Sequence, residues 1–85
     1  MYHYWWTNQA RHQIKKLDPD IQRIIIKKLD YFLTIPNPLS LAKRMTRFEG
    51  GQYRFRISDY RVTFDAKGQM FIILAIGHRS EIYKK

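Results

Sequence analysis

The chain has 85 residues, 45% of them hydrophobic, so it can build one folded core and is too short for a second. Sixteen Lys and Arg against seven Asp and Glu give a formal charge of +9, which favours nucleic acid or an acidic protein as partner. The absence of cysteine excludes disulfides and thiolate metal sites, and no apolar run is long enough to cross a membrane. We therefore predict a single cytoplasmic domain, residues 1–85, with no membrane association.

The first half predicts a strand followed by two helices. The aromatic run at residues 2–6 suits a strand, and Thr7 or Asn8 can cap a helix with apolar residues at helical spacing. Asp18 and Pro19 predict the start of a second helix, which ends before Pro36. The predicted apolar stripe of this second helix consists of Ile21, Ile24, Ile25, Leu29 and Phe32.

The second half predicts three strands joined by short turns. Residues 39–47 are expected to form either a helical turn or an ordered loop, and Gly50 and Gly51 then separate this segment from the next strand. Apolar and polar residues alternate through 52–57 and again through 60–64, which is typical of strands with one buried face. The unbroken apolar run at 70–76 indicates a strand covered on both sides. The short connections favour an antiparallel meander.

Three arginines fall on the polar side of the predicted hairpin. Alternation places Arg54 and Arg56 on one face, and Arg61 and Thr63 are expected on the solvent-exposed face as well. A single arginine on a strand is usually a solvated surface residue. A cluster repels itself, whereas a phosphate bound between the guanidiniums accepts charge-assisted hydrogen bonds. The cluster, together with nearby basic residues, therefore favours a phosphate-binding face.

His78 is the candidate proton acceptor, because histidine is the residue type best suited to exchange a proton near neutral pH; the alternative is that it only ends the strand. The stacking candidates are Tyr60 and Tyr83, and Tyr83 is preferred because Tyr60 lies in the apolar register. No His, Asp and Glu cluster has metal-ligand spacing, and no glycine-rich phosphate loop is present. A metal-dependent nuclease is disfavoured, and no metal or cofactor is predicted.

The segments GQYRFRISDYRVTF and IILAIGHRSEIY resemble the RelE/ParE superfamily of toxin–antitoxin toxins, and within it the RelE branch. The resemblance extends over nearly the whole chain. It implies an α+β fold in which two N-terminal helices pack on a small twisted antiparallel sheet, in the order β-α-α-β-β-β. It also implies a ribosome-dependent, metal-independent endoribonuclease that cuts mRNA in the A site. In such toxins the 2′-hydroxyl attacks the adjacent phosphate and gives a 2′,3′-cyclic phosphate.

The resemblance also implies roles for single residues. Arg54 and Arg56 stand where the best-known RelE toxin has two lysines, and Arg61 falls on the arginine that stabilises the phosphate. Arginine is effectively never deprotonated, so the base role passes to His78 or Glu81. The implied catalytic set is Arg54, Arg56, Arg61, His78, Arg79 and the base-stacking Tyr83. The residues expected to bind RNA or the ribosome are Lys43, Arg44, Arg47, Lys84 and Lys85.

The implied partners are a cognate antitoxin, mRNA and the ribosome, with operator DNA bound only through the antitoxin complex. Two alternatives stay open. A ParE-like inhibitor of DNA gyrase has the same fold but no need of the arginine, histidine and tyrosine set. A non-catalytic RNA-binding module or decayed toxin would bind RNA through the same face and leave it uncut. The GHRSEIY segment favours the RelE reading.

Overall fold

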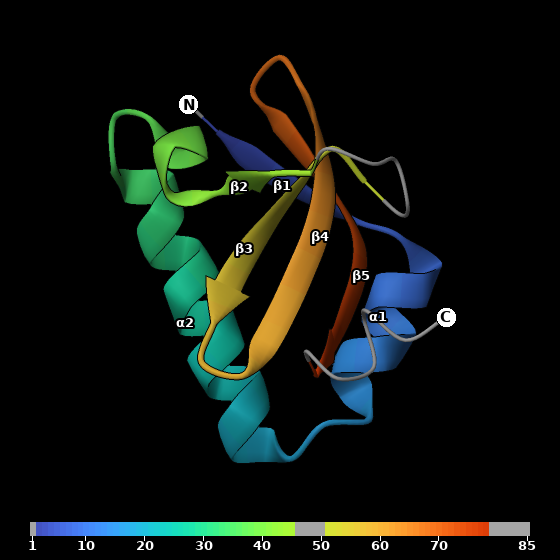
Figure 1. Ribbon diagram of the computed structural model, residues 1–85. Helices are drawn as coiled ribbons and strands as arrows, with labels where there is room; N and C mark the ends of the chain where they lie inside the picture. Colours follow the sequence, from blue (N-terminus) through green and yellow to red (C-terminus); the bar gives the residue numbers. More distant parts are fainter. Residues whose placement is uncertain (1, 46–50, 79–85) are drawn as a thin grey trace.

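The computed structural model describes residues 2–45 and 51–78, and its strands form one five-stranded sheet in the order β1-β5-β4-β3-β2 (Figure 1). The α+β class expected from the sequence is confirmed. Both helices come before the three long strands of the second half. The elements are β1 (His3–Trp6), α1 (Asn8–Lys15), α2 (Pro19–Thr34), the 3₁₀ helix η1 (Pro38–Leu41), β2 (Lys43–Arg44), β3 (Tyr53–Ile57), β4 (Tyr60–Lys67) and β5 (Met70–His78).

The antiparallel meander predicted for the last three strands is confirmed, but the sheet as a whole is mixed, whereas the resemblance implied an antiparallel one. β1 runs parallel to β5, with Tyr4 opposite Phe71, while the pairs β5–β4, β4–β3 and β3–β2 are antiparallel. A parallel pair needs a long crossover connection, and here the helices and the β3–β4 hairpin separate the two strands in sequence. The two-residue strand β2 was not predicted, because two residues are too few to show alternation.

Both helices begin where the sequence predicts. The Thr7 side chain accepts a hydrogen bond from the Ala10 N–H at 3.2 Å and caps α1, and its hydroxyl donates to the Ile73 carbonyl at 2.9 Å. α2 begins at Pro19 directly after Asp18. Ile24 was expected in the apolar stripe of α2 but is 50% exposed, since Ile25 and Leu29 define a buried face that points away from it.

One aromatic-rich core lies between the helices and one face of the sheet. Phe55 is fully buried, and its ring centroid lies 4.5 Å from those of Phe32 on α2 and Phe64 on β4. In Figure 1, α2 runs beside β3 and α1 lies beside β5; the Ile76 N–H donates to Gln13 Oε1 on α1 at 2.7 Å. The buried hydrophobic residues are Ala10, Ile14, Ile25, Leu29, Phe32, Phe55, Ile57, Val62, Phe64, Phe71, Ile73 and Ile76.

A β-bulge sets which residues of β5 enter this core. Thr63 pairs with Ala75 and Phe64 pairs with Ile73, so Leu74 is an extra residue in β5. The bulge explains why Ile73 and Ile76, three residues apart, are both buried. The predicted covering of β5 on both faces is only partial, because the other face carries half-buried side chains. The bulge also reverses the side to which every later residue of β5 points.

Tyr4 joins β1 to α2, and this contact gives a first testable prediction. Its hydroxyl donates to the Leu29 carbonyl, and burial, with the nearby Asp30 charge, raises the pKa of Tyr4 well above its usual value. Tyr4→Phe removes the donor, so we expect the free energy of unfolding at neutral pH to fall by about 1 kcal/mol in urea denaturation.

The same contact has a pH dependence with a definite sign. The pKa of Tyr4 is higher in the folded state than the value of about 10 expected in the unfolded state, so its contribution is complete below pH ~10 and decreases above it. Wild-type stability should therefore fall more steeply with pH above about 10 than that of Tyr4→Phe. Parallel curves for the two proteins would show that the Tyr4 hydroxyl does not contribute.

Candidate nucleic-acid interface

The face of the sheet that points away from the helices carries a group of cationic side chains. Phe55 contacts Phe32 of α2, and because successive strand residues point to opposite faces, Arg54 and Arg56 point to the other one. Lys43 stands opposite Arg54, and Arg56 stands opposite Arg61. Residues paired across strands share a face, with Cβ atoms about 5 Å apart. We call Lys43, Arg54, Arg56 and Arg61 the basic cluster.

The four side chains of the basic cluster differ in exposure. Lys43 and Arg56 are exposed, Arg54 is half-buried, and Arg61 is only 5% exposed. The expectation that Arg61 and Thr63 lie on a solvent-exposed surface is wrong, since Thr63 is 3% exposed. Both residues belong to β4, which has a neighbouring strand on each side. The sequence pattern predicts the face of these side chains correctly but not their depth.

Hydrogen bonds to backbone carbonyls hold the buried Arg61 and Thr63 side chains against the sheet. Arg61 Nη1 donates to the Tyr60 carbonyl at 3.3 Å, and Thr63 Oγ1 donates to the Ala75 carbonyl at 3.4 Å. Arg56 faces Arg61 directly across β3 and β4, and like charges in such a pair repel each other. A phosphate bound at this pair offsets the repulsion, and Arg56 is the member that a ligand can reach.

His78 does not join the basic cluster. It pairs with Tyr60, whose ring lies edge-on to the imidazole with centroids 5.5 Å apart, while Gly77 is the residue opposite Arg61. Tyr60 packs against the core, so the register places His78 on the helix side of the sheet. The packing of Tyr60 agrees with its predicted role as a core residue. Arg44 also points to the helix side, because it pairs with Tyr53.

Six sequence-predicted residues lie outside the described part of the chain: Arg47, Arg79, Glu81, Tyr83, Lys84 and Lys85. Within residues 2–45 and 51–78, no three His, Asp or Glu side chains gather closely enough to hold a metal ion. In the same residues, no helix has the length and apolar character needed to cross a membrane.

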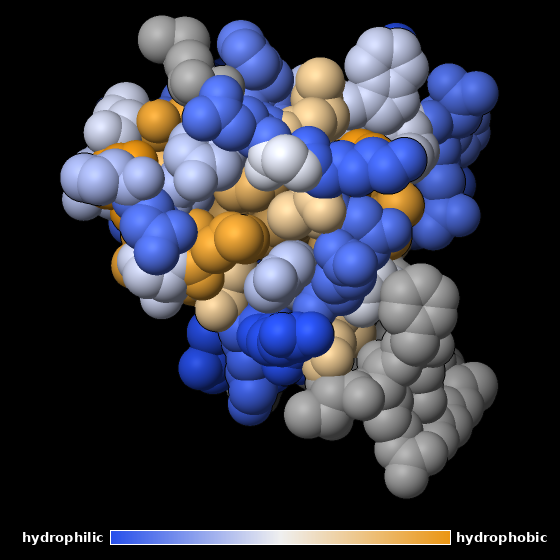
Figure 2. All heavy atoms as spheres, turned by 90° about the horizontal axis from the view of Figure 1, so that it is seen from above, coloured by the Kyte–Doolittle hydropathy of each residue, from blue (hydrophilic) through white to orange (hydrophobic). Residues whose placement is uncertain are grey.

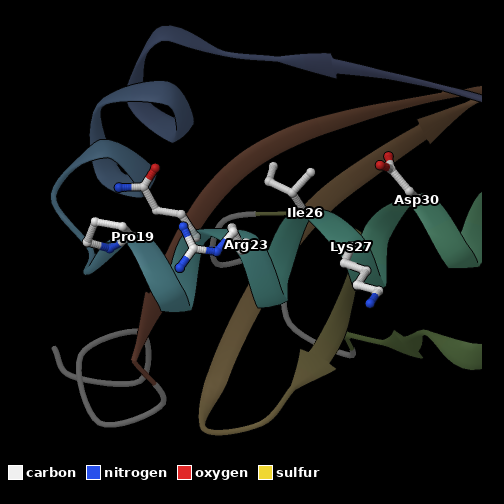
Figure 3. Close-up of a pocket in the computed structure, with 6 residues that line it drawn as sticks. Pro19, Arg23, Ile26, Lys27 and Asp30 are labelled. Carbon is white, nitrogen blue, oxygen red and sulfur yellow. The ribbon is translucent and has the colours of Figure 1, made fainter.

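Two surface features escaped the sequence reasoning. Trp5 is 57% exposed, and the sequence pattern predicted only that its aromatic run forms a strand. On α2, the exposed Ile26 borders an open hollow of about 510 Å³, whose labelled side chains come from successive turns of the helix (Figure 3). Hydrophobic patches are exposed among hydrophilic side chains on the upper surface as well (Figure 2). The hollow is lined by Pro19, Gln22, Arg23, Ile26, Lys27 and Asp30.

Solved structures of similar fold are toxin–antitoxin complexes. One is the RelBE2 complex from Mycobacterium tuberculosis, matched with a TM-score of 0.79 and 26% identity over 92% of this chain and 98% of that chain. The E. coli RelBE complex matches with a TM-score of 0.70 and 17% identity, over 92% and 96% of the two chains. The RelB–RelE complex from Methanococcus jannaschii matches with a TM-score of 0.67 and 22% identity, over 93% and 94%.

A comparison with curated protein sequences gives no match. The family model for the ParE toxin of the type II toxin–antitoxin system parDE matches residues 4–83. That range includes all the long strands and the whole basic cluster. The chain therefore belongs to the ParE toxin family of type II toxin–antitoxin systems, within the RelE/ParE superfamily.

Proposed function

We propose that this toxin is a ribosome-dependent, metal-independent endoribonuclease that cuts mRNA in the A site. The observation that carries the proposal is the basic cluster, in which Arg56 and Arg61 face each other on a rigid sheet. In the proposed reaction the 2′-oxygen bonds to phosphorus, the bond from phosphorus to the 5′-oxygen breaks, and a 2′,3′-cyclic phosphate forms. Negative charge grows on the phosphate oxygens, and fixed cations stabilise it.

The reaction also needs an acceptor for the 2′-hydroxyl proton and a donor for the leaving 5′-oxygen. Arginine cannot accept the proton, because it is effectively never deprotonated. The candidates for the base are therefore His78, which pairs with Tyr60 on the helix side, and Glu81. In this proposal Arg79 belongs to the catalytic set and Tyr83 stacks on an mRNA base. The further contacts to RNA or the ribosome come from Lys43, Arg44, Arg47, Lys84 and Lys85.

A cognate antitoxin is the proposed protein partner. The similar solved structures are complexes of a toxin with its antitoxin, and the first of them is 26% identical over 92% of this chain. With a formal charge of +9, the toxin favours an acidic antitoxin segment that covers the basic cluster. The free toxin would act in the cytoplasm, where ribosomes are, and the pair would bind operator DNA through the antitoxin.

The second candidate function is inhibition of DNA gyrase, favoured by the match to the ParE toxin model over residues 4–83. In that case the basic cluster would contact gyrase or its DNA without cutting a phosphodiester. The two functions share the fold and differ in the molecule that changes: mRNA is cleaved in one case, and plasmid supercoiling stops in the other.

Two assays run in parallel with the same protein preparation test the proposal. Primer extension on an mRNA in a translating extract should show new 3′ ends at the A-site codon, and the same mRNA without ribosomes should stay intact. Gyrase supercoiling should be unaffected, and heat-unfolded protein is the control in both assays. Intact mRNA together with inhibited supercoiling would instead establish the gyrase function. Intact mRNA, normal supercoiling and salt-sensitive RNA binding would indicate a non-catalytic binder.

A further inference from the structure

We propose that Trp5 is a stacking platform for a base of single-stranded RNA that crosses the sheet from the basic cluster to β1. The inference rests on the proposed RNA substrate and adds a positioning residue to it. Trp5 lies at the edge of the sheet farthest from β2, and a strand of RNA bound to both ends would lie across the whole face.

The register places Trp5 on the same face as the basic cluster. Its neighbour Tyr4 donates to the Leu29 carbonyl of α2, and Trp6 packs against the core, so Trp5 points away from the helices. Trp5 pairs with Ile72, which pairs in turn with Asp65 of β4. Asp65 is four residues from Arg61 on the same strand and therefore shares its face.

The indole of Trp5 is open to a ligand. It is 57% exposed, and β1 is an edge strand whose neighbour in the sheet is β5. An exposed aromatic ring beside a cationic surface is the combination that single-stranded nucleic-acid sites use, because bases stack on the ring while cations hold the phosphates. Sheet faces of common RNA-binding domains carry such aromatic platforms.

The chain at Gly51 covers part of the face between Trp5 and the basic cluster, because the buried Gly51 lies against the Leu74 side chain and the Phe64 backbone, and the RNA would pass beside this segment. β1 and β3 are three strand spacings apart, or about 15 Å. The face between them carries half-buried Ile72 and Ala75 and the buried Thr63. The carboxylate of Asp65 on this face accepts a hydrogen bond from the Gln52 N–H at 2.8 Å, which offsets part of its charge. The positive charge of the cluster favours RNA over a peptide as the occupant.

Binding of a short fluorescein-labelled 2′-O-methyl oligoribonucleotide, which cannot be cleaved by 2′-hydroxyl attack, tests the inference by fluorescence anisotropy. Trp5→Ala should weaken the affinity about ten- to a hundred-fold, and Trp5→Phe should keep most of it because the ring is retained. The slope of affinity against salt should not change, since Trp5 carries no charge. Tyr31→Ala is the matched control, because Tyr31 is 56% exposed on α2 and should bind like wild type.

Equal affinity of Trp5→Ala and wild type would overturn the inference, and so would failure of the wild type to bind the oligonucleotide. An unchanged affinity with loss of self-association in Trp5→Ala would assign the ring to contact with a second copy. The readout is independent of cleavage. If Trp5→Ala binds weakly while the wild-type protein leaves mRNA intact in the extract, the stacking role stands and the nuclease proposal fails. If the wild-type protein cleaves mRNA and Trp5→Ala binds normally, the nuclease proposal stands and the stacking role fails.

Discussion

Arg56→Ala is expected to lower the single-turnover rate of ribosome-dependent mRNA cleavage by about a hundred-fold or more, the usual cost of removing one group that stabilises developing charge. Arg56 is the exposed member of the pair with Arg61, so its removal takes a cation from the phosphate without opening the core. The thermal unfolding midpoint should stay close to that of wild type. The rate is measured from the decay of a defined mRNA in a reconstituted translation system.

Two further variants test whether the effect of Arg56→Ala is specific to the position and to the guanidinium group. Lys28→Ala removes an exposed cation from α2, where the ammonium lies 5.9 Å from the ring centroid of Tyr31, and it should cleave at the wild-type rate. Arg56→Lys keeps the charge but loses the planar guanidinium that fits two phosphate oxygens, so its cleavage rate should fall between those of Arg56→Ala and Lys28→Ala. If Arg56→Ala and Lys28→Ala cleave equally fast, the basic cluster does not act on the phosphate.

Local alternation in the sequence predicted β3, the first part of β4 and the face of their side chains. Tyr53, Phe55 and Ile57 alternate with the two arginines of β3, and the structure has the same alternation. The position of His78 could not be predicted in this way. The extra residue Leu74 shifts the register of β5, and a shift by one residue moves each later side chain to the opposite face.

Long-range pairing also lay beyond local pattern. The parallel contact of β1 with β5 joins Trp5 to Ile72, residues that sequence periodicity cannot connect. The burial of Arg61 likewise depends on the strands on both sides of β4 and not on the alternation within it. Charge and pattern therefore predicted which residues form the basic cluster, while its depth and its neighbours required the assembled sheet.

Phe55→Ala is expected to cost about 3–5 kcal/mol of unfolding free energy, because the substitution leaves a cavity where the ring meets Phe32 and Phe64, each at 4.5 Å. Domains of this kind have about 5–15 kcal/mol in total, so a large share of the stability is lost. Urea denaturation measures the change. Phe55→Leu should lose less stability because it fills more of the space, and Tyr31→Ala on the surface should lose no more than about 0.5 kcal/mol.

The same substitution, Phe55→Ala, is expected to affect activity. Because Phe55 lies between Arg54 and Arg56 on one strand, loss of core packing also removes the fixed positions of the basic cluster. Phe55→Ala should therefore lose mRNA cleavage in parallel with folding and regain it on cooling, whereas Arg56→Ala should stay inactive while folded. A cost below about 1 kcal/mol for Phe55→Ala would contradict the aromatic core described here.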